Sequence, residues 1–277
     1  MPEKSKSESE AVTINIQPFL QPVAMVLSAV LIATSIFVTG NKLSLGTVAG
    51  TNTTATTTDT TGTGAVATTV SIDTVKSLYN GDYIKFGDAN RKVLFVEVAD
   101  PSCPYCHIAG GENAALNKSA GAQFTLAADG GTYVAPVSEM RKLVDSGQAS
   151  YMYIYYPGHG NGQMTMKALY CAYEKGKFWE AHDLIMSSAG YDISNTTVQN
   201  DATKSQTVAD FLKSAVDPSF MKSCLDSGKY DSRLSSDQAE ATTLGVSGTP
   251  GFFVNSAKFD GAYSWTDMKP TADAALQ

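Results

Sequence analysis

Two cysteines separated by two residues carry the clearest chemistry of the chain. Cys103 and Cys106 lie in residues 100–107, DPSCPYCH. At a helix start this spacing places both sulfur atoms on one turn, where they can bond to each other. Unpaired N–H groups and the helix dipole there lower a thiol pKa, and Pro104 suits the first turn. We therefore expect Cys103 to attack disulfides and the more shielded Cys106 to resolve the mixed disulfide.

The same spacing occurs in three other kinds of site. CxxCH is the attachment motif of c-type haem, in which His107 would be an axial ligand. A CxxC pair can form half of a zinc site, although Cys171 and Cys224 do not form a second pair. A purely structural disulfide is the third alternative. The favoured interpretation, redox exchange, needs no cofactor and no metal.

The elements around the pair predict an α/β fold. Residues 92–98, KVLFVEV, form a β-branched and aromatic run that predicts a buried strand directly before the cysteines. The other expected elements are a short helix at 72–79, strands at 151–156, 251–254 and 258–263, and a closing helix at 265–276. Residues 163 to about 244 have a helical pattern, so the plan is α/β with a large helical insertion.

A second signal lies far downstream, in residues 245–254, GVSGTPGFFV. A proline cannot donate to a sheet ladder, so Pro250 favours a tight turn before the strand and can adopt the cis form. A Gly-Thr-Pro sequence alone is weak evidence. It becomes specific when a strand, a CxxC pair and a helix precede it.

Three segments together resemble the Dsb-type (DsbA-like) thiol–disulfide oxidoreductases of the thioredoxin superfamily. Residues 97–106, EVADPSCPYC, resemble their active-site strand and helix start. Residues 171–184, CAYEKGKFWEAHDL, resemble their helical insertion, and residues 246–254 resemble the segment with their cis-proline. The resemblance covers about residues 90–277 and implies a thioredoxin-like fold with a helical insertion at about 163–244.

The resemblance also implies roles for single residues. Cys103 would be the exposed nucleophile and Cys106 the resolving thiol, with Pro250 packed as a cis-proline against them. Thr249 would offer its backbone to an extended substrate chain. Glu97 matches the buried acid of the family, which accepts a proton as the resolving thiol ionises. The alternative for Glu97 is a solvated strand residue.

The sequence also leads to expectations for the active-site helix and the segment after it. Pro104 and Tyr105 are expected to contact substrate, with Tyr105 modulating the thiolate, and His107 is expected on the helix surface without a role. Gly110 and Gly111 predict a kink or an early end of the helix. The Gly- and Ala-rich residues 119–137 predict an inserted loop or hairpin.

Two further cysteines lie in the helical block. Cys171 and Cys224 are either buried free thiols or, as an oxidising compartment would favour, a disulfide that closes about 50 residues.

The N-terminal part of the chain differs in composition from the rest. No charged residue occurs between Glu10 and Lys42, and residues 19–40 are apolar enough to span a membrane. A cleaved signal peptide would have a shorter apolar region, so we expect an uncleaved anchor. The expected organisation is a tail (1–18), a transmembrane signal-anchor (19–40), a Thr-rich flexible linker (41–70) and a thioredoxin-like domain (71–277).

Charge and composition exclude some classes of protein. The net charge is −7, which does not suit a nucleic-acid-binding protein.

We expect a single-pass membrane protein with its catalytic domain outside the cytoplasm, or a secreted one if the N-terminal segment is cleaved. It would introduce disulfides into secreted or envelope proteins and exchange electrons with an unidentified membrane redox partner. The alternatives are a reductase or isomerase of the same fold, a membrane-anchored haem electron carrier and a non-catalytic binding module.

Overall fold

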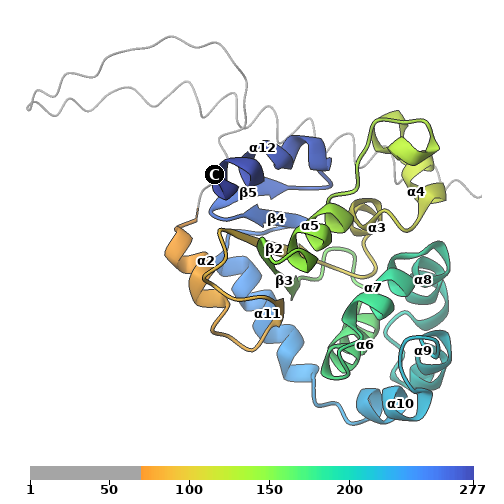
Figure 1. Ribbon diagram of the computed structural model, residues 1–277. Helices are drawn as coiled ribbons and strands as arrows, with labels where there is room; N and C mark the ends of the chain where they lie inside the picture. Colours follow the sequence, from red (N-terminus) through yellow and green to blue (C-terminus); the bar gives the residue numbers. More distant parts are fainter. Residues whose placement is uncertain (1–69) are drawn as a thin grey trace, which may run out of the picture. The chain divides into compact units, whose positions relative to one another are not determined.

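A computed structural model describes residues 70–277 of the protein, which fold around one mixed sheet (Figure 1). The strands are β1 (Ile84–Phe86), β2 (Val93–Ala99), β3 (Ala149–Tyr155), β4 (Gly251–Val254) and β5 (Ala257–Asp260). Their order in the sheet is β1-β3-β2-β4-β5. The central pair β2–β3 is parallel, and the other neighbours are antiparallel. This arrangement places β2, which leads to the cysteines, in the middle of the sheet.

Helices pack on both faces of the sheet, and further helices lie beside it. They are α2 (Ile72–Leu78), α3 (Pro104–Gly110), α4 (Ala114–Ser119), α5 (Pro136–Asp145), α6 (Gln163–Glu174), α7 (Phe178–Met186), α8 (Ser188–Asp192), α9 (Ser205–Phe211), α10 (Pro218–Asp226), α11 (Asp231–Thr243) and α12 (Trp265–Leu276). The expected insertion corresponds to α6–α11, which lie between β3 and β4 in the chain. Figure 1 shows α6 to α10 gathered beside the sheet.

Side chains of β2 alternate between two hydrophobic cores. Phe95 points into the larger core, which includes residues of α3, α5, α6, α7 and α12 and both active-site cysteines. Leu94 and Val96 point to the opposite face, where they pack with residues of α2 and α11. Because both faces are covered, every residue of β2 and β3 is buried. This explains why apolar and aromatic residues dominate both strands.

The helix after the cysteines ends early, as the glycine pair predicts. Helix α3 stops at Gly110, and Gly111 adopts a left-handed conformation with φ 79°. A Cβ atom at Gly111 would lie 2.5 Å from the Cβ of Ala135, so both the backbone angle and the close approach favour glycine. The chain can therefore turn away from the active site immediately after two helical turns.

The segment that follows is an inserted loop, as one of the two expected alternatives has it, and not a hairpin. Between the end of α4 and the start of α5 it contains two short 3-10 turns, at Ala122–Phe124 and Ala127–Asp129. Strand β1 was not expected, and β5 is shorter than the expected strand at 258–263. A three-residue strand and short helices carry too few residues for a periodic pattern.

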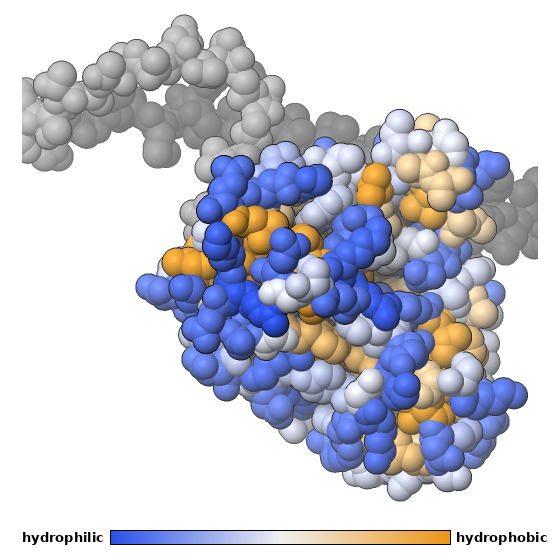
Figure 2. Space-filling model, viewed as in Figure 1, coloured by the Kyte–Doolittle hydropathy of each residue, from blue (hydrophilic) through white to orange (hydrophobic). Residues whose placement is uncertain are grey.

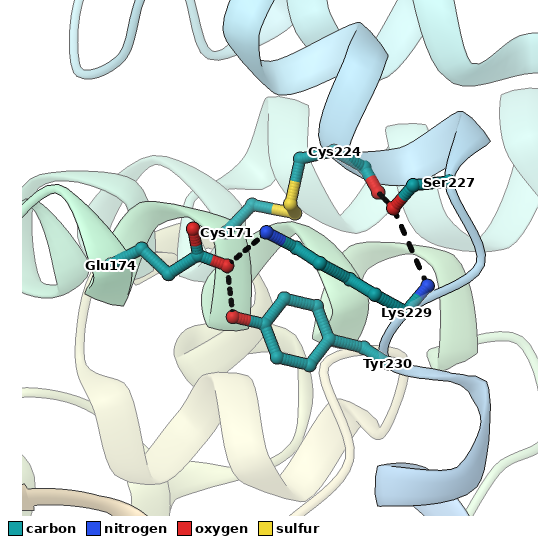
Figure 3. Close-up of a disulfide and its surroundings, with 6 residues drawn as sticks. All are labelled: Cys171, Glu174, Cys224, Ser227, Lys229 and Tyr230. Atoms are coloured by element: carbon teal, nitrogen blue, oxygen red, sulfur yellow. Dashed lines mark hydrogen bonds and ion pairs between the residues drawn. A yellow bond between two sulfur atoms is a disulfide. The ribbon is translucent and has the colours of Figure 1, made fainter.

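A disulfide joins two helices of the insertion. Cys171 of α6 and Cys224 of α10 are bonded across 53 residues (Figure 3). Nearby, the Glu174 carboxylate pairs with Lys229 and accepts a hydrogen bond from the Tyr230 hydroxyl. The disulfide and this pair of contacts both tie α6 to the segment around α10.

The expected tail, anchor and linker (1–18, 19–40 and 41–70) lie outside the described residues, apart from residue 70 itself. In the described part, no helix combines the length and the apolar character needed to cross a membrane. Figure 2 shows hydrophilic side chains over much of the visible face of the domain, with apolar side chains in separate patches.

Candidate active site

The cysteine pair lies where β2 passes into α3. Strand β2 ends at Ala99, Cys103 is the N-cap residue of α3, and Cys106 follows within the first turn. Both are free thiols in the structure. The peptide bond between Thr249 and Pro250 is cis, and the Cys103 thiol donates to the carbonyl oxygen of Thr249 at 3.3 Å. The turn before β4 and the start of α3 therefore meet, although about 150 residues separate them in the sequence.

The environment of Cys103 favours its thiolate. A hydrogen bond from the Cys106 thiol, a contact with Thr249 and the backbone N–H groups of Cys106 and Tyr105 together outweigh burial and lower the pKa of Cys103 to about 6. The side chain is 4% exposed, so the expectation of an exposed nucleophile is wrong. The contact with Thr249 helps to cover the Cys103 sulfur. A substrate sulfur must therefore come close to this covered site before the two sulfurs can react.

The pKa of Cys103 predicts a pH profile. Thiolate is the nucleophile, so we expect alkylation by iodoacetamide to reach half of its maximal rate near pH 6 and to fall at lower pH. Because the folded pKa is below that of an unfolded thiol, the reduced form is stabilised at neutral and higher pH and loses this stabilisation as the pH falls through about 6. Thiolate absorbance at 240 nm checks the value, with a Cys103→Ser variant as the blank. A midpoint above pH 8 would contradict the assignment.

Cys106 is held in the opposite state. It is fully buried, and this burial together with the neighbouring Cys103 raises the pKa of Cys106 well above its usual value. Its sulfur accepts a hydrogen bond from the Asp100 backbone N–H at 3.4 Å. The two sulfurs of the pair therefore differ strongly in acidity, as an attacking and a resolving thiol must.

Glu97 lies in β2 beneath the pair, on the face of the larger core. Its side chain is buried, so the alternative of a solvated strand residue is wrong. One carboxylate oxygen accepts a hydrogen bond from the Tyr151 hydroxyl. Burial raises the pKa of Glu97, against the opposing effects of His182 and of the bond from Tyr151. A buried carboxyl group with a raised pKa can accept a proton from a neighbouring thiol as that thiol ionises.

The three residues expected to contact substrate lie around the rim of the site. Tyr105 is 49% exposed, and its ring packs edge-to-face on Phe124 at 5.9 Å between centroids. Pro104 and Thr249 are partly buried. The structure thus brings Pro104, Tyr105 and Thr249 close to Cys103, and their contacts with a substrate stay a prediction.

His107 is not the surface residue that the sequence analysis expects. It is fully buried, with Nδ1 at 2.8 Å from the Met186 carbonyl oxygen and Nε2 at 2.9 Å from that of Pro101. Burial lowers the pKa of His107, although both carbonyl oxygens oppose this effect. The side chain therefore ties the loop before Cys103 to the end of α7. The helix is so short and so deeply packed that the residue after Cys106 also points inward.

Asp100 is a structural residue of the site that sequence reasoning missed. Its buried carboxylate accepts hydrogen bonds from the backbone N–H and the hydroxyl of Ser102 at 2.8 and 2.7 Å. It also accepts from the backbone N–H groups of His159 and Gly160 at 2.7 and 3.2 Å. One side chain thus fastens the loop after β3 to the cysteine loop. The only sequence signal was its place directly after a buried strand.

Comparison with known proteins places the chain in a family. A family model described as Thioredoxin matches residues 136–274, about half of the chain. The chain belongs to this thioredoxin family. The matched region contains Thr249 and Pro250 but begins after the cysteine pair, so the pair is independent evidence for the same relationship.

One curated relative of this thioredoxin-family chain is a Na⁺/H⁺ antiporter NhaA 3 from Salinispora tropica. The two sequences are 26% identical over 186 residues, which cover 66% of this chain and 23% of the antiporter. The chain therefore spans about a quarter of the length of that relative.

Solved structures share the fold of this thioredoxin-family domain. Oxidised BdbD from Bacillus subtilis has a TM-score of 0.52 at 16% identity, covering 76% of this chain and 98% of BdbD. α-DsbA1 from Wolbachia pipientis has a TM-score of 0.52 at 18% identity, covering 70% and 91%. Reduced DsbG from Mycobacterium tuberculosis has a TM-score of 0.50 at 17% identity, covering 74% and 100%. The expected resemblance to DsbA-like proteins is confirmed at the level of the fold. The family and the two thiols beside the Thr249–Pro250 turn confirm the enzyme class, thiol–disulfide oxidoreductase.

Proposed function

We propose that the protein is a membrane-anchored, extracytoplasmic thiol–disulfide oxidase that introduces disulfides into secreted or envelope proteins. One observation carries the proposal: an acidified Cys103 and a buried, weakly acidic Cys106 share one helical turn beside the Thr249 carbonyl. This asymmetry supports exchange through a mixed disulfide at Cys103.

The reaction moves two electrons from the substrate to the cysteine pair. In the oxidised enzyme, a substrate thiolate attacks the sulfur of Cys103, the bond to Cys106 breaks, and Cys106 leaves as a thiolate that takes a proton. A second substrate thiolate then attacks the substrate sulfur of the mixed disulfide and releases Cys103 as a thiolate. The substrate gains a disulfide, and the enzyme becomes a dithiol. A membrane partner with a disulfide or a quinone would take the electrons and restore the oxidised pair.

The stability of the reduced enzyme supports electron flow from the substrate to the cysteine pair. A thiolate at Cys103 with a pKa of about 6 stabilises the reduced pair at neutral pH and makes the disulfide form more oxidising. The Cys171–Cys224 disulfide supports an oxidising compartment, because such bonds are rare in a reducing cytosol. The apolar residues 19–40 support membrane anchoring.

The haem-carrier alternative is disfavoured by the position of His107. An axial ligand needs an accessible ring nitrogen, whereas both nitrogens of His107 face carbonyl oxygens in the buried core. The reductase or isomerase alternative differs from an oxidase only in potential and partner, and the next measurement separates them.

Equilibrium titration against glutathione tests the direction of electron flow. We expect the full-length chain to have a potential clearly less negative than thioredoxin, shifted toward the value of about −120 mV known for a strong oxidant. The fraction of reduced Cys103–Cys106 pair is read by alkylation and mass spectrometry, with Cys171→Ala/Cys224→Ala as a control that removes other thiol signals. A potential near about −270 mV would indicate a reductase and overturn the oxidase assignment.

A further inference from the structure

Three buried polar atoms from elements of the larger core, which also contains the cysteine pair, have no protein partner. They are Oε1 of Glu97, the hydroxyl oxygen of Tyr153 and Nε2 of His182, and within residues 70–277 none of them makes a hydrogen bond. They come from β2, β3 and α7. Buried polar atoms in proteins nearly always have partners, so a group of them calls for a functional explanation.

The three side chains are neighbours. Glu97 and Tyr153 are register partners in the parallel pair β2–β3. The rings of Tyr153 and His182 meet edge-to-face, with their centroids 6.0 Å apart. Burial raises the pKa of Glu97 while the charge of His182 acts against it, and Glu97 in turn is one of the charges that raise the pKa of Cys106. The group therefore extends electrostatically from the resolving cysteine to α7.

The two nitrogens of His182 face different surroundings. Nδ1 lies 3.3 Å from a carboxylate oxygen of Asp183, whose side chain is 41% exposed. His182 and Asp183 both line a cavity of about 300 Å³, together with Glu112, Arg141 and Trp179 among others. Nε2 is buried on the other side of the ring. The imidazole thus reaches from a surface cavity into the core beneath the cysteines, and a ring with two such nitrogens can take up a proton at one end and release one at the other.

We propose that His182 relays protons between Glu97 and the solvent in this cavity, so that Cys106 exchanges its proton through the helical insertion rather than past Cys103. The inference rests on the proposed thiol–disulfide exchange. When Cys106 resolves a mixed disulfide, its thiol proton passes to Glu97, its sulfur bonds to Cys103, and the bond from Cys103 to the other sulfur breaks, which releases a thiolate. The proton then passes from Glu97 to Nε2, directly or through water, and Nδ1 releases a proton to Asp183 or to water. During substrate oxidation the same path runs in reverse and protonates the Cys106 thiolate.

Several charged or titratable groups surround the relay, and any pH profile includes them. They are Glu97 on β2, Tyr151 and Tyr153 on β3, Cys106 and His107 on α3, Glu112 after α3, Arg141 on α5 and Asp183 on α7.

The release of glutathione from Cys103 isolates the step in which Cys106 loses its proton. The reduced full-length chain is mixed with excess glutathione disulfide, quenched with acid, and analysed by mass spectrometry between pH 5 and 9. We expect His182→Gln to slow release of glutathione about 10-fold near neutral pH, because positioned acid–base groups contribute at least this much. Added imidazole should restore the rate in proportion to its concentration. Alkylation of Cys103 should be unchanged. His159→Gln is the matched control, because this histidine is exposed and the substitution keeps the backbone N–H that donates to Asp100.

A second variant keeps the test decisive if His182→Gln does not fold. Asp183→Asn should slow release about 3-fold, since a carboxylate at the outer end of the relay is lost. Asp145→Asn, which also removes an acidic partner of Arg141, should not change the rate. The relay would be overturned if His182→Gln released glutathione at the wild-type rate, or if it released glutathione slowly and imidazole did not restore the rate. If His182→Gln is unfolded, release at the wild-type rate in Asp183→Asn would overturn it. A wild-type chain that forms no mixed disulfide would instead overturn the proposed function.

Discussion

Cys103→Ser is expected to lower thiol–disulfide exchange by at least about 10³-fold, because a serine hydroxyl forms no nucleophilic anion near neutral pH. Cys106 cannot replace it: the side chain is fully buried and its pKa is raised. Reduction of insulin by dithiothreitol and refolding of reduced ribonuclease both measure the loss.

The matched variant Cys106→Ser should fail differently. Cys103 remains a thiolate that attacks disulfides, but nothing in the pair then resolves the product, so a mixed disulfide with the substrate should accumulate. Non-reducing electrophoresis detects this species. Residual activity above a tenth of wild type in Cys103→Ser would contradict the assignment of the nucleophile. An absence of trapped substrate in Cys106→Ser would contradict the division of roles.

Removal of the second disulfide is expected to produce a large loss of stability. The bond between Cys171 and Cys224 closes a loop across 53 residues. Loop-closure entropy for this length predicts a decrease in the free energy of unfolding on the order of 4 kcal/mol in Cys171→Ala/Cys224→Ala. For a domain of this size, the melting temperature should fall by roughly 10 °C. Urea unfolding monitored by circular dichroism measures the change.

A control separates this disulfide from the active-site pair. Cys103→Ala/Cys106→Ala keeps the disulfide between α6 and α10 as its only cysteine pair. Dithiothreitol should therefore lower the free energy of unfolding of this variant by nearly as much as Cys171→Ala/Cys224→Ala lowers that of the wild type. A decrease below about 1 kcal/mol in both experiments would show that contacts around Glu174 and Tyr230, rather than the bond, hold the two helices together.

Local patterns predicted the core of the fold and the reactive pair. Strands β2 and β3 are buried on both faces, so their β-branched and aromatic side chains mark them in the sequence. Neighbouring residues alone determine three other features: the CxxC pair, the turn at Pro250 and the early helix end at Gly110. A short stretch of sequence is therefore enough to predict them. Glu97 was found through the resemblance to Dsb-type oxidoreductases, because it matches the buried acid of that family.

Features that depend on distant contacts were missed. The donors to Asp100 include His159 and Gly160, about 60 residues away, and one partner of His107 is Met186. No local pattern encodes such partners. The burial of Cys103 was misjudged for the same reason, because the covering Thr249 comes from the far end of the chain.

The insertion also contributes to the cysteine loop itself, which limits how the protein can be shortened. Besides the Met186 carbonyl on His107, the Asn195 side chain donates to the Ser102 carbonyl oxygen at 3.1 Å. Both groups come from segments that a bare thioredoxin core would lack. Excising α6–α11 to engineer a minimal redox module would leave the Ser102 carbonyl and one nitrogen of His107 without these partners, one residue before and one residue after the reactive pair. The helical insertion is therefore needed to hold the cysteine loop in place and cannot be removed as an independent unit.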